Sequence, residues 1–222
     1  MTQQYVAVGF IFVGAILVAS LVVRFAANRY ISRLKKEFSK SGTSGRELVE
    51  RIAASEGLVF DLKEVNEEGT GNFRYEEDLV EIPGLEDDSL STLGIAAHEV
   101  GHAVQAREHR DLLKTFVYLA EAGKYLSYLF PIISITGMIF YYPLLQVGLG
   151  IYATILLIVL AEIPLEVDAS SKALFYLKSY GKSSEEELAL LKKLLGLAIL
   201  TRLTSLTVGF LALFYVNEEV RI

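Results

Sequence analysis

The residues best suited to chemistry are two histidines four positions apart, in the segment HEVGH at residues 98–102. Side chains at positions i and i+4 of a helix lie on one face, so both imidazoles can bind the same metal ion. The intervening Glu99 can reach a water molecule on that ion and take its proton. Because HExxH on a helix is a zinc-hydrolase pattern, we predict Zn²⁺ as the cofactor, His98 and His102 as ligands and Glu99 as the general base.

The composition of the 222-residue chain favours this interpretation over two metal-free histidines on a polar helix face. The chain has only three histidines, and two of them have the ligand spacing. It has no cysteine, which excludes a disulfide scaffold, thiol redox chemistry and thiolate ligands. Its net charge of −6 argues against a nucleic-acid partner, because such proteins need a basic surface for phosphates.

The helix that must carry these residues begins near Leu90. Asp87, Asp88 and Ser89 offer an N-cap, and no proline follows through Leu113, so we expect one helix over residues 90–113. Two further helix starts are predicted. Ser44 and Glu47 form a capping box for a helix that stops at Gly57, and Ser184 and Glu187 form another.

Three segments before the long helix have strand character: residues 58–65, 72–75 and 78–82. They alternate in polarity or carry β-branched and aromatic side chains; Gly69 and Gly71 separate the first two, and Pro83-Gly84 ends the last. We predict a small antiparallel sheet. The last of the three, DLVEI, could bind a substrate peptide as an added strand.

Four apolar stretches predict membrane-spanning helices, since about 20 apolar residues cross a bilayer. They cover about residues 5–26, 126–142, 143–165 and 194–216, and Tyr141-Tyr142-Pro143 separates the middle pair. Lysine and arginine concentrate in the intervening soluble portions, 27–125 and 166–193, which the positive-inside rule places in the cytoplasm. We therefore predict a multi-pass protein of the cytoplasmic membrane, with residues 1–222 as a single membrane-integrated domain.

A catalytic zinc site needs a third protein ligand and leaves its fourth position to water. The remaining histidine, His109, would lie about 10 Å from His102 along a helix, too far to share the ion. The candidates are three carboxylates of the segment 161–174, namely Glu162, Glu166 and Asp168. Glu166 is the first choice, because hydropathy places it at the cytoplasmic end of the third span, on the side of the two histidines.

The chain resembles a family, the YugP-like membrane zinc metallopeptidases. The matching segments are AAHEVGHAVQ at 96–105, IPLEVDASSKAL at 163–174 and LAILTRLTSL at 197–206. The resemblance implies a zinc site formed by His98, His102 and Glu166, with Glu99 as the general base. It also implies that Asp168 is a nearby carboxylate, which would orient a ligating imidazole through its other ring nitrogen.

Arg202 lies inside the last apolar run, where an unpaired arginine costs at least about 2.5–3.5 kcal/mol. One interpretation is structural: the side chain reaches the membrane surface or pairs with Glu162. The other is catalytic: the guanidinium stabilises the oxyanion of the tetrahedral intermediate, or holds Asp168. We retain both.

These inferences combine into a mainly α, four-span membrane protein with a small α+β cytoplasmic zincin-like portion. We expect a gluzincin-type zinc endopeptidase that cleaves membrane-associated or unfolded proteins and peptides at the cytoplasmic surface of the bilayer. The sequence does not predict an oligomeric state. One alternative is an intramembrane protease, although charged residues follow HExxH within two turns. The other is an inactive zinc-binding membrane scaffold or chaperone-like protein, against which the presence of Glu99 argues.

Overall fold

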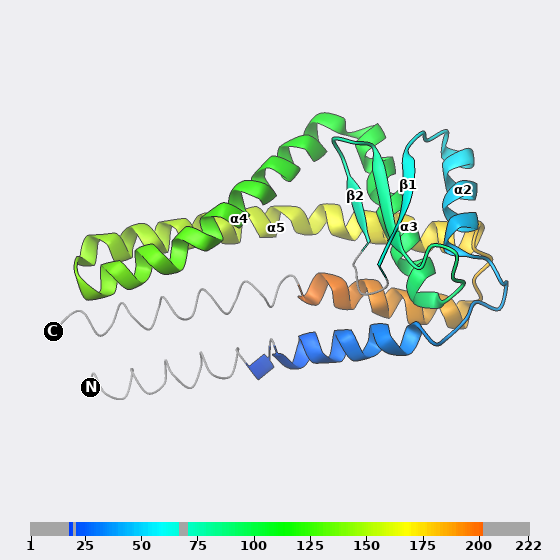
Figure 1. Ribbon diagram of the computed structural model, residues 1–222, viewed down its shortest axis with the longest axis horizontal. Helices are drawn as coiled ribbons and strands as arrows, with labels where there is room; N and C mark the ends of the chain where they lie inside the picture. The colour runs from blue at the N-terminus through cyan, green and yellow to red at the C-terminus, as the bar shows by residue number, and fades with distance from the viewer. Residues whose placement is uncertain (1–17, 20, 67–70, 202–222) are drawn as a thin grey trace. The chain divides into compact units, whose positions relative to one another are not determined.

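A computed structural model describes residues 18–19, 21–66 and 71–201, and this part of the chain is mainly helical (Figure 1). The chain divides into two units. The mixed unit comprises Ala26–Thr115 and Pro164–Ile199, and the helical unit comprises Met1–Phe25, Phe116–Ile163 and Leu200–Ile222. The helices are α2 (Gly45–Glu56), α3 (Leu90–Glu108), α4 (Arg110–Ile139) and α5 (Tyr142–Ser179), together with the helical segments 21–34 and 185–201.

The sheet of the mixed unit has three strands: β1 (Asp61–Val65), β2 (Asn72–Arg74) and β3 (Leu79–Pro83), in the order β1-β3-β2. Strand β2 pairs antiparallel with β3, but β1 pairs parallel with it, so the predicted antiparallel sheet is wrong for β1. Alternating polarity identifies strands and their inward faces, but it does not specify which strands become neighbours.

Strand β3 contains most of the segment DLVEI and lies in the centre of the sheet. Both of its edges are paired, one with β1 and the other with β2. The prediction that this segment binds a substrate peptide as an added strand is therefore wrong, because an added strand needs an unpaired edge.

Helix α3 is the central element of the mixed unit. It begins where the sequence predicts, since Ser89 is its N-cap and accepts a hydrogen bond from the backbone N–H of Thr92. Most of its residues are buried, because it packs against α2, β2, β3 and the segment 185–201. Such a helix is apolar on nearly all sides, which suits a rigid support for a site.

The single helix predicted over residues 90–113 is interrupted at His109. This residue has φ −139° and ψ 52° and ends α3, and α4 begins at Arg110. No proline or glycine marks the break. The end of α3 and the start of α4 have different partners. Arg107 of α3 donates hydrogen bonds to Glu56 of α2, and the Arg110 guanidinium of α4 lies 5.1 Å from the centre of the Tyr75 ring.

The described part of the helical unit consists mainly of residues 116–139 of α4 and 142–163 of α5, and these two segments run antiparallel. Gly148 of α5 packs closely on Ser134 of α4, and the rings of Phe130 and Tyr152 lie 5.4 Å apart. Residues 140–141 separate the two helices, which confirms the break predicted at Tyr141–Pro143. Many apolar side chains on both helices are exposed, including Leu129, Ile132, Ile139, Val147, Leu157 and Leu160.

Within the described residues, one helix is long and apolar enough to cross a membrane: Gln146–Ser179, with a mean hydropathy of 2.1. It contains most of the span predicted at 143–165. The stretch 126–142 falls mainly in α4, which does not meet the same criterion, and most of 5–26 and 194–216 lies outside the described residues. The described residues therefore contain one of the four predicted spans as a candidate membrane helix.

Candidate metal centre

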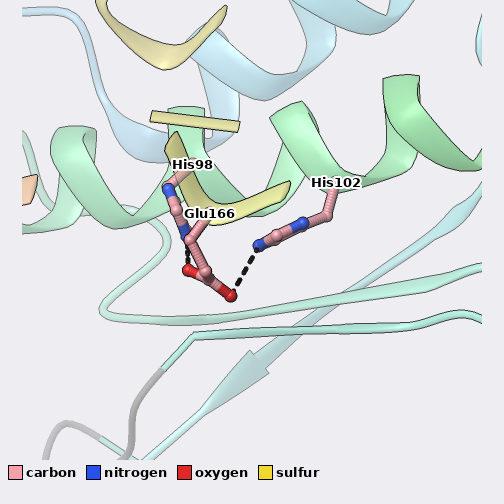
Figure 2. A group of neighbouring side chains, drawn as sticks. All are labelled: His98, His102 and Glu166. Carbon is pink, nitrogen blue, oxygen red and sulfur yellow. Dashed lines mark ion pairs between the residues drawn. The ribbon is translucent and has the colours of Figure 1, made fainter. Parts of the chain in front are cut away.

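Three predicted ligands meet in the mixed unit, two from α3 and one from α5. His98 Nε2 lies 3.3 Å from Glu166 Oε2, and His102 Nε2 lies 3.8 Å from Glu166 Oε1. Figure 2 shows both imidazoles directed at this carboxylate. The imidazole rings are nearly perpendicular, with centres 4.8 Å apart, and one ligand atom from each residue lies within 4.8 Å of the others.

The close approach of α3 and α5 makes this meeting possible. A Cβ atom added at Gly101 would lie 2.8 Å from the carbonyl oxygen of Ala169, so only glycine fits at position 101. Helix α5 continues through Pro164, and Glu166 is therefore presented from a helix. Of the three carboxylates considered as the third ligand, Glu166 joins the cluster, while Asp168 lies beside it and Glu162 belongs to the helical unit.

The geometry fits a tetrahedral zinc ion. Zinc lies about 2.0–2.2 Å from nitrogen and oxygen ligands, so neighbouring ligands of a tetrahedral site are about 3.4 Å apart. The two observed nitrogen–oxygen separations, 3.3 and 3.8 Å, are close to this value. Two imidazoles and one carboxylate also form the donor set of a catalytic zinc site, which leaves a position for water.

Glu99 lies next to the ligands on α3 and is 9% exposed. Its side chain packs against the start of β2: a Cβ atom added at Gly71 would lie 3.0 Å from Glu99 Cγ and 3.3 Å from Oε1. The same Cβ would lie 2.3 Å from Ile95 Cγ2. Glycine at position 71 therefore leaves the space that the Glu99 side chain occupies.

A second layer of polar side chains contacts the imidazoles from behind. His102 Nδ1 lies 2.9 Å from Gln105 Oε1, and Gln105 Nε2 donates to Asp168 Oδ2 and to the carbonyl oxygen of Leu165, both at 2.8 Å. His98 Nδ1 lies 3.4 Å from the Ser170 hydroxyl. The expected direct contact between Asp168 and an imidazole is therefore corrected, because Gln105 stands between them.

Three residues of the site were not predicted from the sequence: Gly71, Gln105 and Ser170. Two of them had a signal in helical spacing, since Gln105 is three residues after His102 and Ser170 is four after Glu166. Gly71 had none, because its role depends on where β2 meets α3. His109 is exposed, outside the cluster, and Arg202 lies outside the described residues.

Comparison with known proteins agrees with this geometry. Residues 9–218 match the family described as "Putative neutral zinc metallopeptidase". The chain belongs to this family. It is also 28% identical over 205 residues to the "Putative membrane protease YugP" of Bacillus subtilis (strain 168), an alignment that covers 90% of each chain. No solved structure matches.

As a member of the zinc metallopeptidase family, the chain has its three candidate ligands and Glu99 inside the matched region. Family membership and the donor set both indicate zinc. The resemblance noted from the sequence motifs is thereby confirmed at the level of the family.

Proposed function

We propose that the protein is a membrane-bound, zinc-dependent endopeptidase of the gluzincin type, with His98, His102 and Glu166 as metal ligands and Glu99 as the general base. The observation that carries the proposal is the convergence of two imidazoles and a buried carboxylate from two helices, with Glu99 one residue from a ligand. A structural zinc site would instead fill all four positions with protein ligands.

The metal ligands and Glu99 have different roles in the proposed peptide hydrolysis. Zn²⁺, when bound, supplies Lewis acidity that lowers the pKa of a water molecule to about 7. Glu99 takes the proton of the attacking water and delivers it to the leaving amine, as a general base and then a general acid.

The same proposal places the reaction at the cytoplasmic surface of the membrane. It is supported by the charge distribution of the soluble portions, by the candidate span within α5 and by the similarity to a protein named as a membrane protease. The four-span topology belongs to this proposal. Because Glu166 follows the predicted third span directly, suitable substrates are membrane-associated or unfolded proteins and peptides presented near that surface.

Replacement of Glu99 by glutamine tests the catalytic assignment. We expect Glu99→Gln in detergent to retain the zinc content of the unaltered protein while losing cleavage of an unstructured protein substrate, by about two orders of magnitude or more. The matched control is Glu50→Gln, an exposed glutamate of α2. Equal cleavage by Glu99→Gln and the unaltered protein would contradict the proposal. Zinc binding without cleavage by either protein would favour the inactive scaffold.

Arg202 retains its proposed catalytic role as a separate prediction. Lysine keeps the charge but lacks the planar fork that binds an oxyanion or carboxylate through two hydrogen bonds. If Arg202 acts on the reaction, Arg202→Lys will lower turnover and leave the zinc content unchanged. Unchanged turnover would leave only the structural interpretation.

A further inference from the structure

Gln105 lies at the centre of a directional chain of hydrogen bonds behind the metal centre. It is 2% exposed and projects from α3 one turn after His102. One end of its amide contacts His102 Nδ1, and the other end contacts Leu165 and Asp168 of α5. Nothing in the HExxH pattern assigns this residue a function.

The two contacts with α5 determine which way the amide points. The backbone oxygen of Leu165 can only accept a hydrogen bond, and Asp168 Oδ2 accepts another from Lys172 Nζ at 2.7 Å. A flipped amide would direct its oxygen at both acceptors at 2.8 Å and lose two hydrogen bonds. The –NH₂ group must therefore face α5, and the amide oxygen must face His102.

This orientation fixes the proton on the imidazole. An amide oxygen only accepts, so the partner atom, His102 Nδ1, must carry hydrogen. In a neutral imidazole the other nitrogen, Nε2, then has a free lone pair, and this is the atom directed at Glu166. We propose that Gln105 is a positioning residue that holds His102 in the Nδ1–H tautomer, so that Nε2 is ready to bind the metal before the metal arrives.

His98 provides a comparison within the same site. Its Nδ1 lies 3.4 Å from the Ser170 hydroxyl, which can donate or accept. Ser170 therefore does not dictate a tautomer, whereas the Gln105 amide does. The two histidines should therefore differ before the metal binds. Gln105 fixes the tautomer of His102, whereas His98 takes the tautomer that the metal requires when the ion binds.

The inference rests on the proposed zinc site and predicts a measurable effect on it. Hydrogen-bonding partners of metal-bound histidines typically change metal affinity by 10- to 100-fold when removed. Gln105→Met keeps the length of the side chain but removes all its hydrogen bonds. Gln105→Glu loses the donors to α5 but keeps an acceptor for Nδ1–H. Zinc affinity should fall by about 10-fold or more in the methionine variant and by less in the glutamate variant.

The tautomer itself can be read directly in metal-free protein by NMR of ¹⁵N-labelled histidine, at a pH raised until the ¹⁵N shifts no longer change. Only three imidazoles contribute signals, and His109→Gln removes the one outside the site. Zinc affinity is measured on the same samples by competition with a chelator. Gln146→Met, at an exposed position of α5, is the matched control, and circular dichroism checks that each variant keeps its helical content.

We expect His102 to show the Nδ1–H form in the unaltered protein and in Gln105→Glu, and a mixture of tautomers in Gln105→Met with weakened zinc binding. An unchanged tautomer in Gln105→Met would overturn the inference, even if zinc affinity fell, because packing alone would then explain the loss. Absence of zinc binding by the unaltered protein would instead contradict the proposed function, and the metal-free NMR measurement would still decide the tautomer.

Discussion

At the scale of the residue, Gly71, just before β2, leaves room for the side chain of Glu99, the proposed general base. A Cβ atom added at position 71 would be 2.3 Å from Ile95 Cγ2 and 3.0 Å from Glu99 Cγ, so Ile95 would have to move and Glu99 would have to give by a few tenths of an ångström. Contacts below 3 Å force atoms to move. The absence of a side chain at position 71, just before β2, therefore helps to position the Glu99 side chain.

Gly71→Ala should displace Glu99 while leaving the three ligands in place. We expect kcat to fall by about two- to tenfold, because Glu99 has to give by only a few tenths of an ångström, whereas a misplacement of about 1 Å can cost about 100-fold, and we expect the zinc content to stay the same. Gly196→Ala is the control, since a Cβ at that position meets no atom within 4 Å. Full activity of Gly71→Ala with bound zinc would show that Glu99 is not held there.

The sequence predicts the proposed metal ligands better than the residues that position the ligands and the general base. The spacing of His98 and His102 predicts their common face, and hydropathy singled out Glu166 among three carboxylates. Gln105 and Gly71 act through contacts between α3 and other elements, which depend on how these elements pack. A local spacing rule does not contain that information.

At the scale of the element, Glu187 connects two parts of the mixed unit. Its carboxylate accepts hydrogen bonds from the backbone N–H groups of Ser184, at 2.6 Å, and Lys40, at 2.8 Å, and its own N–H donates to the Ser184 hydroxyl at 3.3 Å. The capping box predicted for this helix is confirmed, and the contact with Lys40 adds a link between distant segments. Burial raises the pKa of Glu187, but these hydrogen bonds outweigh it and hold the pKa below its ordinary value.

Glu187→Gln should lower the free energy of unfolding by about 1–2 kcal/mol at neutral pH, because glutamine offers only one acceptor oxygen. A lowered pKa in the folded state stabilises the fold above the unfolded-state pKa, about 4.3, and this stabilisation is lost as pH falls through the folded value. The difference between the two proteins should therefore shrink when unfolding is measured near pH 4.

Glu185→Gln is the control for this measurement, since its exposed ion pair with Lys178 contributes little to stability. A difference for Glu187→Gln that stays constant from neutral pH to about pH 4 would contradict the assignment to an ionised Glu187.

Capping signals located α3, α2 and the segment 185–201 correctly at their starts, because a cap is a local interaction between neighbours in the sequence. The order of the strands and the break at His109 were not predicted. Both depend on contacts between elements: β3 inserts between β1 and β2, and Arg107 and Arg110 bind different partners on either side of the break.

At the scale of the whole molecule, the proposed topology predicts opposite locations for Glu47 and Gln146. Glu47 belongs to the first soluble portion, and Gln146 lies near the turn between the middle two predicted spans. The chain has no cysteine, so a single cysteine at either position gives an unambiguous label. We expect a membrane-impermeant thiol reagent to label Gln146→Cys in intact cells and Glu47→Cys only after the membrane is opened. Labelling of both from the same side would contradict the topology.

The division of the chain into a mixed unit and a helical unit matches the predicted separation of a soluble α+β portion from apolar helices only in outline. Hydropathy located α5 and its separation from α4, but it did not show that α5 runs on through Pro164 to Ser179. That continuation carries Glu166 to α3. The sequence predicts an apolar span at 143–165 and a separate soluble portion from residue 166, whereas α5 contains the whole span and the first part of that portion.

The most direct test of the account is the zinc content of three purified proteins: the unaltered chain, Glu166→Ala and Glu162→Ala. The two glutamates lie one helical turn apart on α5, so the variants differ only in which carboxylate is removed. We predict a single bound zinc ion in the unaltered protein and in Glu162→Ala, and little or none in Glu166→Ala. Full zinc content in Glu166→Ala would contradict the proposed metal centre.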